Sequence, residues 1–168
     1  MSALHAIELT LDEEQRDCYQ EITNVAMGQA ADLLARLLNV YVILPIPNVN
    51  LLEVTELQMA LSELENSQSV SAVCQGFIGA GISGEALLIF NDASFEDIAR
   101  LMDFEGEVDD SSEVELLTDV ASILNGACLN GIAQQLDVNF SLGHPVVLGQ
   151  HCSISELVKA ENKQWKKA

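Results

Sequence analysis

The sequence has few positive charges. Of its 168 residues only seven are Lys or Arg, whereas 26 are Asp or Glu, which gives a formal net charge of −19 at pH 7. A surface this acidic repels nucleic-acid phosphates and anionic lipid headgroups. We therefore expect neither a nucleic acid nor a membrane surface among the partners of this chain.

Histidines are also scarce, and the cysteines are scattered. The three histidines and four cysteines show neither the spacing of a zinc site nor a C-x-x-C motif, so we expect no metal or cofactor bound by the chain itself. No signal-like segment opens the sequence, and a reducing, cytoplasmic location is expected. His144 and His151 are interpreted as ordinary surface histidines near strand ends. The phosphate loop and the nucleophile elbow of common small-molecule enzymes are absent as well.

What the sequence does have is enough apolar residues for one core. A chain of 168 residues that is 49% hydrophobic predicts a single domain over 1–168. Apolar residues at helical spacing predict a long amphipathic helix over Asp12–Asn39. The run Val40–Val49 is rich in β-branched residues and is predicted to be a strand, which Pro45 and Pro47 would keep at an edge or end early.

The middle of the chain predicts a β-hairpin. Two runs rich in strand-forming residues, 70–78 and 85–90, flank the glycine-rich stretch 79–84. A short helix is expected before the hairpin, over 58–65. A second one is expected after it, beginning at Asn91 or Ser94 as its cap and running to about Met102.

An acidic stretch, Glu105–Glu113, is predicted to link two related halves. After it, a helical run over 114–135 and an extended run over 138–147 repeat the order of the first half. The matched pairs, each 98 positions apart, are Gly28 with Gly126, Ala35 with Ala133, Leu38 with Leu136, Val40 with Val138, Leu44 with Leu142 and Pro47 with Pro145. We interpret this as an internal duplication with halves over about 11–103 and 113–168, the second incomplete. Either the sheet has an open edge or the chain is shortened at its C-terminus, and an open edge favours a homodimer.

A polar stripe on the first helix is the candidate for chemistry. Asp17, Glu21 and Asn24 stand at positions i, i+4 and i+7, within about 60° of arc, and Gly28 continues the stripe. The apolar residues on the opposite side are Ile22, Ala26, Ala30, Leu33 and Leu37. Any amphipathic helix turns polar residues to solvent, so spacing alone favours an ordinary surface. However, Gly costs about 1 kcal/mol relative to Ala in an exposed helix, so its presence asks for a reason.

The same residues carry a family resemblance. The run Asp17–Ala31 resembles the first signature helix of the CheC, CheX and FliY phosphatases: Asp or Ser, three residues, Glu, two residues, Asn, and usually a Gly. Phe77–Phe90 is similar to the central hairpin of that family, and the likeness runs from about Leu11 to Leu148. The resemblance implies an α+β, pseudo-two-fold fold in which two long signature helices pack against a largely antiparallel sheet.

The resemblance also implies residue roles and partners in bacterial chemotaxis signalling. Glu21 would form an ion pair with the active-site lysine of a phosphorylated CheY-like response regulator. Asn24 would orient the water that attacks the aspartyl-phosphate, while Asp17 and Gly28 would contact the partner. Phosphoryl transfer needs positioning and charge stabilisation more than covalent help, which fits such a site. The Mg²⁺ ion would belong to the regulator.

The second helix departs from the pattern. At the positions equivalent to Asp17, Glu21 and Asn24 it carries Glu115, Asp119 and Ser122. A hydroxyl reaches less far than an amide and lacks its planar geometry, so we expect a weak or silent second centre. The alternative to a phosphatase is a non-catalytic adaptor that binds CheD, a flagellar-switch component or a response regulator through the same surfaces.

Overall fold

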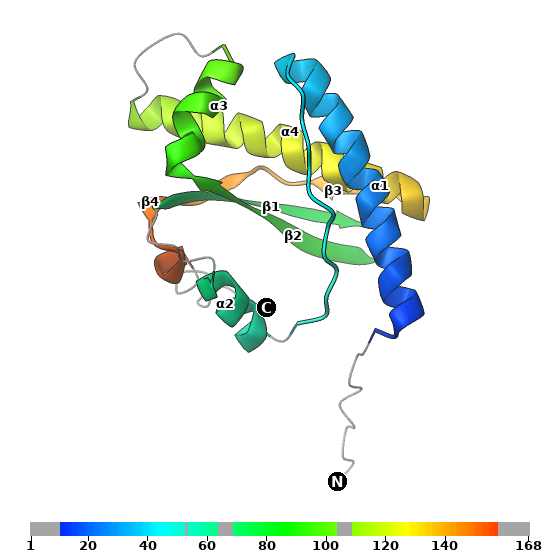
Figure 1. Ribbon diagram of the computed structural model, residues 1–168. Helices are drawn as coiled ribbons and strands as arrows, with labels where there is room; N and C mark the ends of the chain where they lie inside the picture. Colours follow the sequence, from blue (N-terminus) through cyan, green and yellow to red (C-terminus); the bar gives the residue numbers. More distant parts are fainter. Residues whose placement is uncertain (1–10, 53, 64–68, 104–108, 158–168) are drawn as a thin grey trace.

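Figure 1 shows the computed structural model of the chain, which describes residues 11–52, 54–63, 69–103 and 109–157. In chain order the elements are α1 (Glu13–Leu38), α2 (Val54–Glu63), β1 (Val70–Gly79), β2 (Ile82–Asn91), the 3₁₀ turn η1 (Asp92–Ser94), α3 (Phe95–Leu101), α4 (Asp110–Leu136), β3 (Ser141–Leu142) and β4 (Val146–Cys152). The strands form one antiparallel sheet, in which β1 pairs with β2 on one side and with β3 and β4 on the other. The architecture is α+β, as expected.

The predicted β-hairpin is confirmed and is the centre of the sheet. β1 and β2 pair along their whole length, from Val70 opposite Asn91 to Gly79 opposite Ile82. The turn is only two residues, Ala80 and Gly81, with φ values of 50° and 76°. Two positive φ angles match the twist of an antiparallel pair, so this turn sets the register of the hairpin. In the described part of the chain, β2 has β1 as its one neighbour, which leaves its outer edge open.

The two long helices end in the same way. Asn39 after α1 and Asp137 after α4 both adopt left-handed backbone angles, with φ of 50° and 52°. These two caps lie 98 positions apart (137 − 39 = 98). In each case the next N–H donates to the carbonyl five residues earlier: Val40 to Ala35 at 3.2 Å, and Val138 to Ala133 at 2.9 Å. The same capping geometry therefore recurs at the spacing of the sequence repeat.

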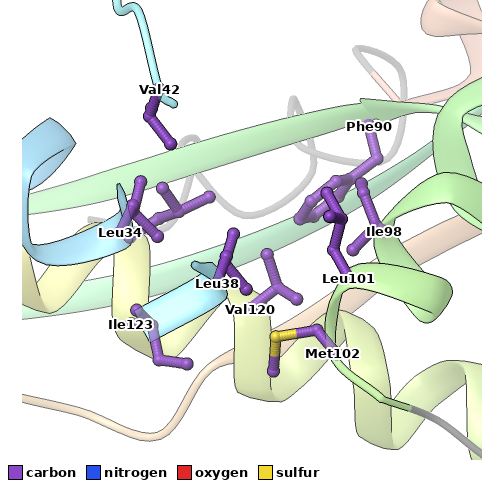
Figure 2. A pocket seen from close by; sticks show the side chains of 10 residues that line it. Leu34, Leu38, Val42, Phe90, Ile98, Leu101, Met102, Val120 and Ile123 are labelled. Atoms are coloured by element: carbon purple, nitrogen blue, oxygen red, sulfur yellow. The ribbon is translucent and has the colours of Figure 1, made fainter. Parts of the chain in front are cut away.

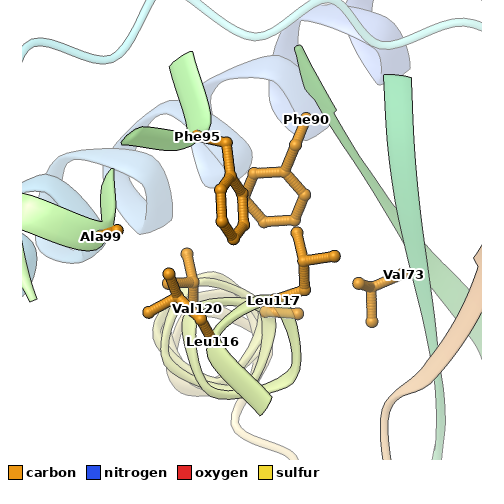
Figure 3. Packing of buried hydrophobic residues seen from close by; sticks show 8 residues of the cluster. Val73, Phe90, Phe95, Ala99, Leu116, Leu117 and Val120 are labelled. Atoms are coloured by element: carbon orange, nitrogen blue, oxygen red, sulfur yellow. The ribbon is translucent and has the colours of Figure 1, made fainter. Parts of the chain in front are cut away.

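The main core lies where α4 crosses one face of the sheet. Figure 3 shows the cluster, in which Leu117 of α4 is almost fully buried beside Val73 of β1. The other buried members are Phe90, Phe95, Ala99, Leu116, Val120 and Ala121. α1 packs mainly on α4, and α4 in turn packs on the sheet (Figure 1). The order is thus sheet, α4, α1, with most of the contacts of α1 made to the other helix.

The buried side of α1 differs slightly from the prediction. Ala26, Ala30 and Leu34 are buried, whereas Leu33, expected on the core side, is 46% exposed. A Cβ atom placed on Gly131 of α4 would lie 2.8 Å from the Cα of Ala26. The two helix backbones therefore approach closely at this crossing, and the small side chains of α1 face α4 while the bulky Leu33 lies beside the contact.

The predicted strand Val40–Val49 is wrong. These residues have no strand assignment, although their side chains alternate between half-buried and exposed, and Tyr41 is 89% exposed. Pro45 and Pro47 lie two positions apart, so the same edge of the segment lacks two N–H donors. The equivalent run 138–147 is also shorter as a strand than expected. It is split into β3 and the start of β4, with Pro145 between them.

The boundaries of the short elements also moved. The helix expected over 58–65 is α2, which begins at Val54; residues 64 and 65 lie outside the described part. The predicted linker Glu105–Glu113 is partly wrong because α4 already begins at Asp110, capped by Asp109, whose carboxylate accepts from the Ser112 N–H at 2.8 Å. Its residues 105–108 lie outside the described part.

A small apolar cavity lies at the C-terminal end of α1. Figure 2 shows it between α1, α3, α4 and Val42, with a volume of about 160 Å³. Its lining side chains are Leu34, Leu38, Val42, Phe90, Ile98, Leu101, Met102, Val120, Ile123 and Leu124, all of them apolar. A cavity of this chemistry does not favour a phosphate or another charged group. It is therefore no candidate for the polar chemistry expected from the sequence.

The length and composition of α4 would by themselves allow it to cross a membrane. Its apolar residues are accounted for by the fold, because Leu116, Leu117, Val120 and Ala121 pack in the core described above. The helix has polar residues as well, among them the exposed Glu115 and Asp119. We therefore interpret α4 as the central helix of a globular domain.

Candidate functional site

The polar stripe predicted on α1 is exposed along its whole length. Asp17, Glu21 and Asn24 all point into solvent. Among the described residues, neither the Glu21 carboxylate nor the Asn24 amide has a side-chain partner. One helical turn separates the two groups, which is roughly 4.5 Å along the helix axis. An acceptor and an amide are thus presented together and remain available to an outside molecule.

Gly28 leaves the surface beside Asn24 flat. A Cβ atom built at this position would meet nothing within 4 Å, and the residue is exposed. Packing inside the domain therefore gives no reason for a glycine here. By contrast, Gly131 of α4 is needed for the crossing with α1. A glycine in an exposed helix interior costs stability, so its benefit at position 28 would lie in the close approach of another backbone.

The N-terminal half of α1 has no fully buried side chain. The buried residues of this helix begin at Ala26, and the helix starts with a capping box in which Asp12 accepts from the Gln15 N–H at 2.8 Å. The exposed acidic residues of this half are Asp12, Glu13, Glu14, Asp17 and Glu21; its one exposed basic residue is Arg16. The stripe is therefore part of a negatively charged surface, which attracts a partner with a positive charge.

The equivalent positions on α4 are placed differently. Glu115 and Asp119 are exposed, but Ser122 is half-buried, and so is Gly126. A Cβ atom on Gly126 would lie 3.9 Å from Cδ1 of Leu142, at the sheet. This second stripe therefore begins on the surface and runs into the interior, and its hydroxyl is less accessible than the amide of Asn24.

A second polar cluster joins β1, β4, η1 and α4 at the opposite end of the sheet from the stripe of α1. His151 of β4 places Nδ1 2.9 Å from Asp92 Oδ2 and Nε2 3.0 Å from Glu113 Oε2. Ser71 donates to the other oxygen of Asp92 at 2.9 Å. Glu113 is buried at the start of α4, and its Oε1 has no partner among the described residues. His151 is exposed near the end of β4, as interpreted from the sequence, but its contacts with two carboxylates were not expected. No local sequence pattern indicates this cluster, because its residues are up to 80 positions apart.

A buried amide pair attaches the middle of α4 to the sheet. Asn125 donates from Nδ2 to Gln75 Oε1 at 3.2 Å, and Gln75 donates from Nε2 to the carbonyl of Gly143 at 2.9 Å. Both side chains are buried, so each hydrogen bond satisfies a group that would be costly to leave alone. This pair explains polar residues inside the fold without a catalytic role.

The arrangement of acidic and sulfur-containing side chains does not suggest a metal centre. Within the ranges that the structure describes, no group of three or more His, Cys, Asp or Glu side chains is placed to hold a metal ion. The four cysteines are free thiols. Burial raises the pKa of the Cys128 thiol above its ordinary value, which makes it a poor nucleophile at neutral pH. The exposed stripe on α1 is therefore the main candidate for a functional surface.

The fold has counterparts among solved structures. The crystal structure of FliY from Thermotoga maritima matches with a TM-score of 0.62 and 21% identity, over 83% of this chain and 70% of that chain. A CheC-like superfamily protein from Shewanella sp. PV-4 matches with a TM-score of 0.54 and 14% identity, over 79% of each chain. The chain has the CheC-like fold. No protein-family model and no curated protein sequence matches this chain.

The two long helices of this fold are the ones that carry the two polar stripes. The exposed stripe of α1 and the departing stripe of α4 stand on the two helices in which the resemblance placed its signatures. At these identities the likeness speaks for the fold alone. The roles of Glu21 and Asn24 therefore rest on the sequence pattern and on their exposure in the structure.

Proposed function

We propose that this chain is a cytoplasmic phosphatase that removes the phosphoryl group from the aspartyl-phosphate of a CheY-like response regulator in chemotaxis. The observation that carries the proposal is the exposed pair Glu21 and Asn24, one turn apart on α1, beside a glycine that nothing in the domain requires. The CheC-like fold and the signature pattern support the same activity.

Docking is the task of the acidic end of α1. The phosphorylated site of such a regulator contains a lysine. The Glu21 carboxylate would form an ion pair with it when the stripe of α1 docks against that site. A carboxylate without an internal partner loses no existing contact when it binds a cation. Asp17 lies one turn earlier on the same face and would extend the contact, while Gly28 would allow the regulator's backbone to come close.

Asn24 supplies the chemical step. Its side-chain amide can accept from and donate to a water at once, which fixes the direction of attack on phosphorus. A neutral amide does this without repelling the phosphoryl oxygens, as a carboxylate at that position would. The Mg²⁺ ion that neutralises the developing charge would be held by the regulator. The chain would thus complete an active site whose other half belongs to its substrate.

The test is the decay of phosphoryl groups on a purified CheY-like regulator. Wild-type protein should accelerate decay, and Asn24→Ala should lose on the order of a hundredfold of that acceleration, as removal of one positioned amide does elsewhere. Asn50→Ala is the control, because Asn50 is an exposed asparagine outside both helices. Equal activity of the Asn24→Ala and wild-type proteins would contradict the role of Asn24.

A non-catalytic adaptor is the second candidate, with CheD, a flagellar-switch component or the regulator itself as its partner. It is favoured by the second stripe, in which the amide is replaced by the half-buried Ser122. An adaptor would bind the phosphorylated regulator or CheD without changing the decay rate, and would bind equally after Asn24→Ala. Binding that is lost in Glu21→Gln but kept in Asn24→Ala, with no acceleration by wild type, would identify the adaptor.

A further inference from the structure

The polar cluster around His151 lies at an irregularity in strand β4. Val70 is opposite Cys152 and Ala72 is opposite Gly149, so Ser71 alone faces two residues of β4, Gln150 and His151. This is a β-bulge, a feature that bends a strand and redirects a side chain. His151 also has a left-handed backbone angle, with φ of 49°. Such an angle is costly for a residue other than glycine, so the surrounding contacts must hold it in place.

The contacts of the imidazole ring account for the strained backbone angle of His151. The imidazole lies between two carboxylates from different elements, Asp92 after β2 and Glu113 in the first turn of α4. Both ring nitrogens stand within 3.0 Å of a carboxylate oxygen. A neutral imidazole can donate from only one nitrogen, whereas the imidazolium donates from both. The geometry therefore fits the protonated ring.

The contact between His151 and Glu113 connects the first turn of α4 to strand β4. Its side chain is only 8% exposed, and its Oε1 already lacks a partner among the described residues. When the ring is neutral, one of the two carboxylates faces a lone pair in place of an N–H. Whichever nitrogen keeps its proton, deprotonation also removes the positive charge beside the buried Glu113 carboxylate. A buried carboxylate that loses its cationic partner is strongly unfavourable, so Glu113 would move towards water and take the first turn of α4 with it.

We propose that His151 is a pH-sensitive clasp, which holds the N-terminal end of α4 to the sheet while the ring is protonated and releases that end as the pH rises. The end in question carries the exposed Glu115 and Asp119 of the second stripe. Release would change how this surface is presented without touching the stripe on α1. The proposal is independent of the phosphatase activity.

The direction of the pKa shift of His151 agrees with release of α4 as the pH rises. Hydrogen bonds to Asp92 and then to Glu113 raise the pKa of His151 above its ordinary value. Stability from a raised histidine pKa is fully present below about pH 6.5 and is lost as the pH climbs through the folded-state value. Burial opposes the shift at Asp92, but hydrogen bonds from Ser69, His151 and Ser71 lower its pKa overall. The contribution of Asp92 is therefore lost only in strong acid, below its ordinary pKa.

The other titratable groups near the ring are engaged elsewhere. Asp109, at the start of α4, accepts from Ser112, and the thiol of Cys152 lies 3.6 Å from the carbonyl of Val70. Burial and the nearby Glu156 raise the pKa of Cys152, so this thiol stays neutral through the relevant range. Among the described residues, the two carboxylates that face the ring are thus Asp92 and Glu113.

Amide hydrogen exchange on the full chain tests the clasp between about pH 5.5 and 8.5. After correction for the intrinsic rates, protection in the first turns of α4 should fall as the pH rises, by up to about tenfold for each unit by which the His151 pKa is raised. Amides of the β1–β2 hairpin serve as the internal reference. A wild-type protein whose α4 protection is independent of pH would overturn the proposal.

Variants at His151 distinguish the effect of the titrating ring from the effect of the left-handed backbone angle. His151→Asn should give low protection without pH dependence, because asparagine tolerates the left-handed angle but cannot carry the charge. His144→Asn, a change of the same kind at an exposed histidine of the same sheet region, should behave as wild type. If His151→Asn does not fold, Asp92→Asn provides the test: the His151 titration observed by NMR should move to lower pH. Retention of the full pH effect in either His151→Asn or Asp92→Asn would refute the clasp.

Discussion

α1 and α4 occupy equivalent places in the sequence repeat but have opposite surroundings. α1 contacts mainly the other helix, and its buried side consists of Ala26, Ala30 and Leu34. α4 lies between α1 and the sheet and buries residues from its first turn onward, beginning with Glu113. Both helices end in the same left-handed cap. The difference therefore comes from what packs against each helix and not from local helix structure.

This comparison gives a physical reason for the difference between the two stripes. A stripe on the outer helix can keep an amide, an acid and a glycine, because no other part of the domain constrains them. On the central helix the same positions approach the sheet, so Gly126 and Ser122 are half-buried. Such positions are selected for packing as well as for chemistry. An outer helix is the better place for a docking surface.

The largest expected effect comes from the core of α4. Leu117→Ala should lower the free energy of unfolding by about 2–5 kcal/mol, because the side chain is 1% exposed and its loss leaves a cavity. Leu33→Ala on α1 is the matched control and should cost at most about 1 kcal/mol, since that side chain is 46% exposed. Chemical denaturation measures both. Similar losses for the two variants would mean that the helices are not buried as differently as described.

Substitutions of Gly131 on α4 and Gly28 on α1 should change the free energy of unfolding by smaller amounts and in opposite directions. A Cβ on Gly131 would lie 2.8 Å from Cα and 3.1 Å from the carbonyl oxygen of Ala26, so Gly131→Ala should separate the helices and cost about 1–3 kcal/mol. Gly28→Ala meets nothing within 4 Å and should stabilise α1 by up to about 1 kcal/mol. Denaturation midpoints should therefore move in opposite directions. A stabilising Gly131→Ala would show that the close crossing is not required.

The smallest effect is expected at the second stripe. Ser122→Ala should leave dephosphorylation within about twofold of wild type, in contrast to Asn24→Ala, because the hydroxyl is half-buried and is not expected to orient a water. The decay assay used for Asn24 measures this directly. A loss comparable to that of Asn24→Ala would mean that both helices carry active centres, and the division between α1 and α4 would fail.

The elements with strong local signals were predicted well. The hairpin follows from two β-rich runs around Ala80 and Gly81, and α1 from its apolar period and its flanking Asp12 and Asn39. The strand predicted at Val40–Val49 was wrong because β-branched composition does not supply a neighbour to pair with. Whether such a run becomes a strand depends on another segment of sheet lying alongside it, which composition cannot reveal.

In the candidate site, too, relations between nearby residues were predicted and contacts between distant residues were not. Local spacing was sufficient to place Asp17, Glu21 and Asn24 on one face, because helical geometry fixes the relation between residues a few positions apart. It could not find the contact of His151 with Glu113, which joins residues 38 positions apart. The prediction that Leu33 lies on the core side was also wrong, because the helical period alone does not show which apolar residues the other helix covers.

By itself, the sequence determined the properties that depend on neighbours along the chain: the strongly acidic charge, the long helices, the hairpin turn and the polar stripe of α1. Only the tertiary structure decided which helix lies against the sheet, which stripe stays open, and that His151 joins two carboxylates. The physical reason is that helix and turn geometry act over a few residues. Burial and charge pairing instead depend on which distant segments meet, and that is a property of the whole fold.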